Sequence, residues 1–397
     1  MKVFFRTVHL YLSLAAGLVI MIACLTGAIL VFEKELQMAF NNSRYYVAAQ
    51  GNPMAVDDLV LSVKAQHPEA RLAGVKLYSD PERTVEIGLS FPEKVGKGNA
   101  NEKQGAKPEG PKVAAAGKPA AQGGGRASHT AFVNPYTAEV VELYTYRETF
   151  FYKVFALHRW LLGSSDGIGK YIVGVSTFLF MFITITGIVL WWPKTRRILV
   201  QRLKIKQDAG WKRLNHDLHI VLGFYASIFL FIFSFTAMSW SFKWFNKGLY
   251  KVTSSSPETP EPPASVYQPG KASISYQDAY RIASEKFSGA VWYQLRSAKD
   301  SAGIFTVAVL PEGRMENATD TYYLDQYSGE IAGTLRFAEK NLGQRVRSYV
   351  KPVHVGSVFG TTSKVISFIV CVLGVTFPVT GVVMWLNRLK KERKRST

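Results

Sequence analysis

Four stretches of the sequence are long and apolar enough to cross a lipid bilayer as helices. About 20 mostly apolar residues span the hydrocarbon core, and four stretches meet that length: Val8–Phe32, Tyr171–Trp192, Leu218–Trp240 and Val365–Leu386. The first exceeds the roughly 7–15 apolar residues of a cleavable signal peptide, so we expect it to be retained. The sequence predicts a membrane α-helical protein with a four-span transmembrane helix bundle.

The basic residues predict the orientation of these spans. The formal net charge is +19, and residues 1–8, 194–213 and 388–395 contain 16 of the 48 basic residues. Each segment adjoins an apolar stretch, and basic residues beside spans stay on the cytoplasmic side. We therefore expect both termini in the cytoplasm, and no nucleic acid among the partners.

The predicted organisation alternates spans with two outer modules. In chain order we predict a first span (1–40), a first module (41–150), a histidine-bearing segment with the second span (151–193), a basic cytoplasmic loop (194–213), a third span (214–245), a second module (246–345), a histidine-bearing segment with the fourth span (346–387) and a basic cytoplasmic tail (388–397). Low-complexity composition predicts a disordered insertion at 93–128 and a Ser/Pro linker at 254–271.

Each outer loop has the pattern of a small α+β module. Helical periodicity is followed by alternating strand patterns in both loops. The predicted elements are helices at Val56–Gln66 and Tyr276–Phe287, and strands at Arg71–Tyr78, Thr84–Phe91, Val291–Arg296 and Ile304–Leu310. Both loops close with a hairpin signature, at 131–141 and 322–331.

Four histidines stand at matched span entrances. His9 and His219 open the first and third spans from the cytoplasmic side, and His158 and His354 precede the second and fourth from the outer side. An internal duplication with a two-fold axis along the membrane normal would bring His9 near His219, and His158 near His354.

Threonine spacing supports the duplication. Thr26 follows the first histidine by 17 residues, and Thr236 follows the third by the same number. The pairs Thr186-Gly187 and Thr380-Gly381 follow the other two histidines by 28 and 26 residues. The sequence therefore predicts two copies of the same order of elements: span, outer module, histidine, span.

Facing imidazoles in an apolar bundle suit haem. Two such rings supply both axial ligands of a haem iron, and the sequence has no Cys-x-x-Cys-His, so the haem would be b-type. We predict two haems b, with axial pairs His9/His219 on the cytoplasmic side and His158/His354 on the outer side. Small residues near the ligands would let a flat ring approach the backbone: Gly17, Gly163, Gly223, Gly356 and Gly360.

Other readings of these histidines exist. A single histidine at a span end is usually an interfacial residue with a solvated tip, but four in matched positions favour ligation. His216 lies three residues before His219 and is the alternative ligand, or a propionate partner. A bare metal-ion site is less well supported, because no carboxylates or further histidines accompany either pair.

Basic residues flank the outer pair. Arg159 and Arg347 are the candidates for haem propionates or an anionic substrate, since arginine binds carboxylates bidentately. An interfacial fringe is the alternative. The remaining members of this set are Arg147, Lys153, Arg345 and Lys351.

Missing motifs restrict the electron source. The sequence has no Walker motif, no Gly-x-Gly-x-x-Gly after a strand and no nucleophile triad, and its cytoplasmic segments are too short for a nucleotide-binding domain. Electrons would come from a cytoplasmic reductase or a membrane quinol.

The closing segments of the outer loops and the entries of the spans resemble those of a known family. The closing segments 134–140 and 325–331 resemble those of PepSY domains. The segments Leu157-His158-Arg159-Trp160-Leu161-Leu162-Gly163 and 215–223 resemble the span entries of PepSY-associated transmembrane proteins. The resemblance covers the chain except the insertion. Asn134 and Ala138 depart from the usual Asp and Gly, which puts the surface role of that module in doubt.

The resemblance implies a bacterial inner-membrane protein with periplasmic modules, and the family includes di-haem reductases of ferric siderophores. Carried over, it gives the same two histidine pairs to the two haems. We therefore expect a transmembrane electron-transfer protein that reduces a ferric siderophore or another Fe(III) chelate. The alternative is a haem-free, membrane-anchored PepSY protein that regulates or binds a periplasmic partner.

Overall fold

The computed structural model describes residues 1–92, 128–206, 208 and 210–396. Apart from Ser128, the predicted insertion at 93–128 lies outside the described residues. The chain divides into two compact units. We call them the helical unit (Met1–Leu36, Arg147–Val252 and Val346–Thr397) and the sheet unit (Gln37–Tyr146 and Thr253–Arg345).

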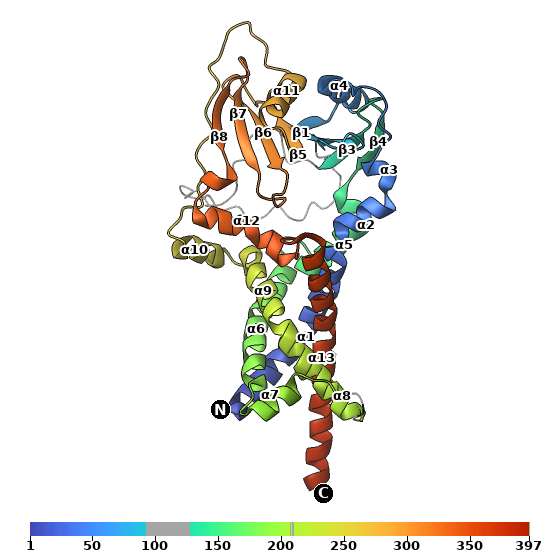
Figure 1. The fold of residues 1–397 in the computed structure, drawn as a ribbon, viewed down its shortest axis with the longest axis vertical. Helices are drawn as coiled ribbons and strands as arrows, with labels where there is room; N and C mark the ends of the chain where they lie inside the picture. Colours follow the sequence, from blue (N-terminus) through green and yellow to red (C-terminus); the bar gives the residue numbers. More distant parts are fainter. Residues whose placement is uncertain (93–127, 207, 209, 397) are drawn as a thin grey trace, which may run out of the picture. The chain divides into compact units, whose positions relative to one another are not determined.

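The described chain contains four helices that are long and apolar enough to span a membrane, as predicted. They are α1 (Lys2–Val31), α6 (Ile168–Trp191), the run Trp211–Ser241 and α13 (Gly360–Ser396) (Figure 1). Their apolar windows contain at most two charged residues. The chain is therefore a multi-pass membrane protein, with a lipid bilayer as its surroundings.

The third span is interrupted near its start. It consists of α8 (Trp211–Asp217), a π-helical turn η2 (Leu218–Leu222) and α9 (Gly223–Ser241). A π-turn holds one more residue per turn than an α-helix and is frequent at functional sites. Here it contains His219 and changes the rotation of the helix between His216 and the rest of the span.

The fourth span is longer than predicted. The basic tail continues α13 as a helix to Ser396, so α13 has 37 residues and a length of about 55 Å at 1.5 Å per residue. Lysine and arginine are good helix formers, and Arg388 donates a hydrogen bond to Glu392 one turn later (2.8 Å). Without a glycine or proline after Leu386, no residue in the sequence ends the helix there.

The helical unit packs around α1. Its buried residues Ala16, Ile20 and Cys24 contact Leu230 of α9 and Val370 of α13. Close approach requires small residues on the partner helix. A side chain at Gly374 would bring its Cβ to 2.6 Å from the Cys24 Sγ, for example. The two cysteines, Cys24 and Cys371, are buried free thiols.

Eight strands of the described sheet unit form one antiparallel sheet in the order β4-β3-β2-β1-β5-β6-β7-β8. The strands are β1 (Arg71–Tyr78), β2 (Val85–Ser90), β3 (His129–Val133), β4 (Val140–Tyr144), β5 (Ala290–Arg296), β6 (Ile304–Pro311), β7 (Asp320–Asp325) and β8 (Ile331–Leu335). The two predicted modules are thus not separate sheets. They join because β1 pairs with β5, with Val75 opposite Leu295.

Two helices cover one face of this sheet, α4 (Val56–Gln66) and α11 (Tyr276–Lys286). Alternate strand residues point to this face and form one core with the helices. Leu59, Ile87, Leu295 and Phe305 are its large, fully buried members. Burial of this stripe explains why the alternation in the sequence predicts the strands within one or two residues.

Each half of the sheet ends in the same tight turn. Asn134 and Asp325 accept hydrogen bonds from the backbone N–H two residues later (2.9 Å each). Ala138 and Gly329 occupy the equivalent left-handed position, with φ of 57° and 75°. An alanine in this conformation is strained, so the departure from glycine in the first loop changes the residue and keeps the turn.

The two cover helices cap each other. The Asp57 carboxylate of α4 accepts the backbone N–H groups of Tyr276 and Gln277, at 3.0 and 2.9 Å. In return the Gln277 side chain accepts the backbone N–H of Val56, at 2.9 Å. These three bonds satisfy first-turn donors that a helix leaves unpaired. They join the two halves of the sheet unit above the β1–β5 seam.

Candidate functional site: paired histidines of the helical unit

Each of the four histidines at the span entrances contacts a threonine on a neighbouring helix through its Nδ1 atom. The four contacts have the same geometry and nearly the same length. The Nδ1–Oγ1 pairs are His9–Thr186 (2.9 Å), His158–Thr26 (3.0 Å), His219–Thr380 (2.8 Å) and His354–Thr236 (3.0 Å). All eight residues belong to the helical unit.

In the first half of the chain, α1 supplies one histidine and one threonine, and the segment 150–191 supplies the partner of each. His9 of α1 bonds Thr186 of α6, while His158 of α5 (Phe150–Trp160) bonds Thr26 of α1. His9 and Thr26 are 17 residues apart on one helix, which is about 25 Å along its axis. The two histidine levels are therefore separated by most of the roughly 30 Å hydrocarbon core.

The second half repeats the exchange. His219 of η2 bonds Thr380 of α13, and His354, the last residue of α12 (Leu342–His354), bonds Thr236 of α9. His219 and Thr236 are again 17 residues apart on one span. Each half of the chain thus holds one histidine at each level.

The halves bring their histidines together in pairs. The ring centroids of His158 and His354 are 6.2 Å apart, with an interplanar angle of 64°. His9 and His219 lie within electrostatic range of each other. A metal–imidazole bond of about 2 Å on each side of an ion, plus about 1 Å from each nitrogen to its ring centroid, gives a centroid separation of about 6 Å. The outer pair has this separation.

The other nitrogen of each ring, Nε2, has no hydrogen-bond partner among the residues that the structure describes. Within the described residues, nothing hydrogen-bonds Nε2 of His9, His158, His219 or His354. Nitrogen is a metal ligand through such an available lone pair. The four rings are therefore anchored through one nitrogen and available through the other.

Glycines after three of the threonines make room for the rings. A Cβ at Gly27 would lie 3.5 Å from Cε1 of His158, one at Gly187 would lie 3.4 Å from Cε1 of His9, and one at Gly381 would lie 3.3 Å from Cε1 of His219. Larger side chains would crowd the imidazoles. The five glycines predicted to let a flat ring approach the backbone are different residues, and that prediction stays untested; a Cβ added at one of them, Gly17, would lie 3.4 Å from Pro378.

His216 is placed differently from His219. Its Nδ1 lies 3.3 Å from the Asp217 carboxylate, and its side chain is 44% exposed. Asp217 is buried and also pairs with Arg213 at 2.8 Å. The π-helical turn η2 begins between the two histidines, and only His219 has a threonine partner among the described residues. The choice of His219 over His216 as the ligand stays a prediction.

Two arginines converge beside the outer pair. The guanidinium carbons of Arg159 and Arg347 lie 5.9 and 5.7 Å from the Trp240 ring, and the same ring contacts His354 at 5.2 Å between centroids. Neither arginine forms an ion pair with a carboxylate of the described chain. Two cations that share one tryptophan without an acidic partner form a suitable binding place for an anion.

Burial keeps the outer imidazoles neutral. His158 and His354 lie in the short helices α5 and α12, outside the four spans. Removal from water lowers the pKa of His158 to about 4 and the pKa of His354 to about 3. Both rings are therefore uncharged at physiological pH, the protonation state that a metal ligand requires.

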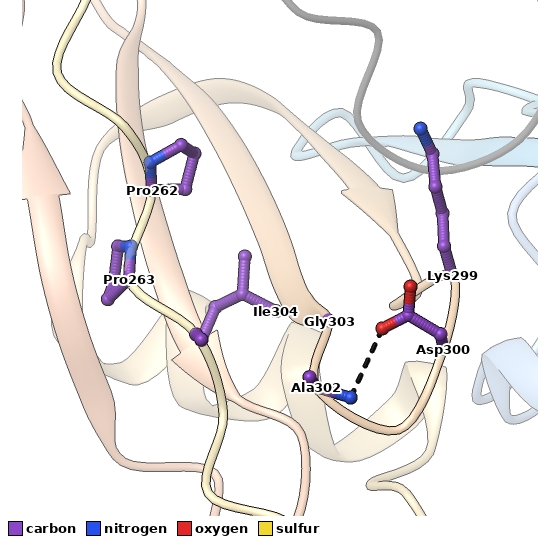
Figure 2. A pocket seen from close by; sticks show the side chains of 8 residues that line it. Pro262, Pro263, Lys299, Asp300, Ala302, Gly303 and Ile304 are labelled. Atoms are coloured by element: carbon purple, nitrogen blue, oxygen red, sulfur yellow. Dashed lines mark hydrogen bonds between the residues drawn. The ribbon is translucent and has the colours of Figure 1, made fainter.

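The sheet unit contains a shallow hollow of about 270 Å³ between the linker and the loop before β6. Pro262, Pro263 and Ile304 line it on one side, and Asp300 accepts the Ala302 N–H (3.1 Å) on the other (Figure 2). The Lys299 side chain extends away from the prolines. This lining contains one carboxylate and no histidine or cysteine, so it has no set of groups for catalysis or metal binding.

The described residues include no group of three or more His, Cys, Asp or Glu side chains that could hold a bare metal ion. Within the described residues, each histidine pair therefore has no third ligating side chain beside it.

The partner threonines were the residues that the sequence could not assign. Spacing related Thr26 to His9 because both lie on one span, whereas the hydrogen bond joins Thr26 to His158. Trp191, near the end of its span, is buried on α6 and stacks on Phe224 at 3.5 Å, and its Nε1 has no acceptor in the described chain. The repeated Thr-Gly pairs were the available signal for the threonines.

Comparison with known proteins agrees with the resemblance of the motifs. No curated protein matches the sequence significantly. The family model of the PepSY-associated TM region matches residues 6–388, a range that includes all four spans, both histidine pairs and the whole sheet. The chain belongs to this PepSY-associated transmembrane family.

Proposed function

We propose that the helical unit binds two b-type haems, one between His9 and His219 and one between His158 and His354. The observation that carries the proposal is the 6.2 Å separation of the His158 and His354 rings, each with Nδ1 anchored and Nε2 available. When bound, haem supplies one-electron redox chemistry that amino-acid side chains lack. Histidine on both sides of the iron, together with burial, sets the potential.

The chain's residues supply binding, orientation and insulation. The threonines anchor all four rings, and the three Thr-Gly glycines leave space beside His9, His158 and His219. Phe233 and Trp240 lie 6.2 and 5.2 Å from His354 between ring centroids, and Phe377 lies 5.9 Å from His219. Arg159 and Arg347 would pair with propionates or with an anionic substrate at the outer level. All four histidines are half-buried in the helical unit.

The two levels support transfer of electrons across the bilayer. A separation of about 25 Å along α1 between the two histidine levels supports one pair in each leaflet. For each electron that a reduced cytoplasmic protein gives up, one chelated Fe(III) would become Fe(II). A quinol would instead be oxidised to the quinone with release of two protons and would reduce two chelated Fe(III). Oxygen-rich chelators such as siderophores hold hard Fe(III) more tightly than Fe(II), so reduction would promote release.

The same proposal includes the topology. Basic residues at 194–213 and 388–395 support a cytoplasmic location for the termini, and the sheet unit would then lie in the periplasm of a bacterial inner-membrane protein. An internal duplication is supported by the repeated order of helix and four strands in the sheet unit and by the repeated exchange of histidine contacts.

A visible absorption spectrum of the purified protein, oxidised and then reduced with dithionite, tests this function. We expect bis-imidazole b-type bands and two haems per chain. Electron transfer to an added Fe(III) siderophore should then re-oxidise the reduced protein. A colourless protein from cells supplied with ample haem would overturn the proposal and favour the haem-free regulatory alternative.

A further inference from the structure

The four threonines have no free hydroxyl proton. Each side chain is close to the backbone carbonyl four residues earlier in its own helix, the usual back-bonding of a buried helical threonine. The distances are 2.6 Å for Thr26 to Ile22, 2.8 Å for Thr186 to Phe182, 2.7 Å for Thr236 to Ile232 and 2.9 Å for Thr380 to Thr376. A hydroxyl has one proton to donate, so each Oγ1 acts as an acceptor toward its histidine.

Each Nδ1 also faces a second acceptor. His158 Nδ1 lies 3.0 Å from the Ala23 carbonyl, and His354 Nδ1 lies 3.1 Å from the Phe233 carbonyl. The Ile183 and Phe377 carbonyls lie near His9 and His219 in the corresponding positions. In every case this carbonyl belongs to the residue three positions before the threonine. A carbonyl oxygen only accepts, so the proton between these groups belongs to the imidazole.

We propose that Thr26, Thr186, Thr236 and Thr380 are positioning residues that lock the four histidines in the Nδ1–H tautomer. A neutral imidazole carries one proton, so this lock leaves Nε2 unprotonated on all four rings. The inference rests on the proposed function, because it concerns the ligand nitrogen that each ring offers to a haem iron. It adds that one span acts at both levels. α1, for example, carries the ligand candidate His9 at one level and Thr26, the partner of His158, at the other.

A hydrogen bond from Nδ1–H makes the imidazole a stronger donor to a metal and fixes the orientation of the ring. Stronger donation favours Fe(III) over Fe(II) and lowers the potential. Loss of such a partner typically weakens metal binding by roughly 10–100-fold. The threonines therefore act on haem retention and on potential while contacting only the histidine.

The test compares Thr186→Val with Thr184→Val in the full-length, haem-loaded protein. Both threonines lie on α6 and are 6% exposed. Thr184 donates to the Met181 carbonyl (2.7 Å) and contacts no histidine. Valine keeps the shape and removes the hydroxyl. To isolate one level, both substitutions are made in a His354→Ala background, which should keep only the pair His9 and His219.

For Thr186→Val we expect faster loss of haem to apomyoglobin, by roughly 10-fold or more, a higher midpoint potential and altered g-values of the ferric low-spin signal. Thr184→Val should match the background, and Thr186→Ser should restore all three properties because it returns the acceptor. Unchanged retention, potential and g-values in Thr186→Val would overturn the tautomer lock.

The outcomes separate this inference from the proposed function. If the unsubstituted protein contains no haem, the proposed function fails first. If it contains two haems and the threonine variants are indistinguishable from Thr184→Val, the haem sites stand and the positioning role is wrong. Misfolding of Thr186→Val would show as loss of its helical content in circular dichroism, and the serine variant then decides the question through retention and potential.

Discussion

The imidazole rings of His158 and His354 come from different halves of the chain, and their centroids are 6.2 Å apart. Each ring is anchored on its far side by a threonine of its own half, Thr26 or Thr236, at 3.0 Å. The separation of the pair is therefore decided by how the two halves pack. A cofactor bound between the rings would therefore join the two halves of the chain.

Replacing one histidine of a pair should remove one haem and leave the other. We expect His354→Ala and His9→Ala each to reduce the haem content from two to one per chain, because bis-imidazole binding requires both rings. Haem is counted as the pyridine haemochromogen against protein concentration. His216→Ala is the control, because this half-exposed residue pairs with Asp217, and it should keep both haems. Equal losses in all three variants would contradict the assignment.

Removing the cations near Trp240 should affect the outer level alone. We expect Arg159→Gln and Arg347→Gln to lower the midpoint potential of the His158/His354 site, because a nearby positive charge favours the reduced form, which carries one less positive charge. A lost charged hydrogen bond of about 1.5 kcal/mol also corresponds to roughly 10-fold weaker retention.

Redox titration of each arginine variant in a His9→Ala background measures the outer site by itself. Arg281→Gln is the control, since Arg281 is exposed in the sheet unit and pairs with Asp278 and Glu285. A potential that stays the same in both variants would show that these arginines are only an interfacial fringe.

Removal of the Asp57 carboxylate should loosen the start of α11. Asp57→Ala leaves the N–H groups of Tyr276 and Gln277 without their acceptor, and lost caps cost about 1 kcal/mol. Hydrogen exchange measured by mass spectrometry should show faster exchange at both amides by about 5-fold. Asp58→Ala provides the matched control: it removes an exposed neighbouring carboxylate with no such bond, and protection at α11 should be retained.

Alanine in place of Gly329 and glycine in place of Ala138 should have opposite effects on the stability of the two equivalent turns. Gly329→Ala places a Cβ 2.9 Å from Ile282 Cδ1 at φ 75°, and left-handed backbone costs a non-glycine residue about 1–2 kcal/mol. We expect the sheet unit to open more readily. Ala138→Gly relieves the same strain at φ 57° and should stabilise by up to about 1 kcal/mol, less the entropy of the freer unfolded chain.

Native-state proteolysis of the full chain reports both turn variants through the population of the open form. Faster cleavage is expected for Gly329→Ala, and slower cleavage for Ala138→Gly. The same change in both variants would mean that the two turns are not equivalent in energy.

The elements of this protein were largely predictable because their signals are local. Hydropathy over about 20 residues gives a span without reference to any other part of the chain. Alternation predicted β1 at Arg71–Tyr78, and helical periodicity predicted α4 at Val56–Gln66, both with no error. The hairpin turns follow from Asn134 and Asp325, whose side chains bond their own backbone. The extension of α13 was not predicted, because basic residues beside a span indicate a cytoplasmic tail and do not show whether that tail is helical.

The pairing of residues was decided only by tertiary structure. Sequence spacing identified the histidines and the threonines as two matched sets, yet it did not show that Thr26 bonds His158 rather than His9. Nor did it show that β1 and β5 join the modules. Contacts of this kind depend on which helices pack together and which strands pair. They join segments more than a hundred residues apart, so no local signal predicts them. Residue types and spacing determined which groups this chain can offer; the fold decided their partners.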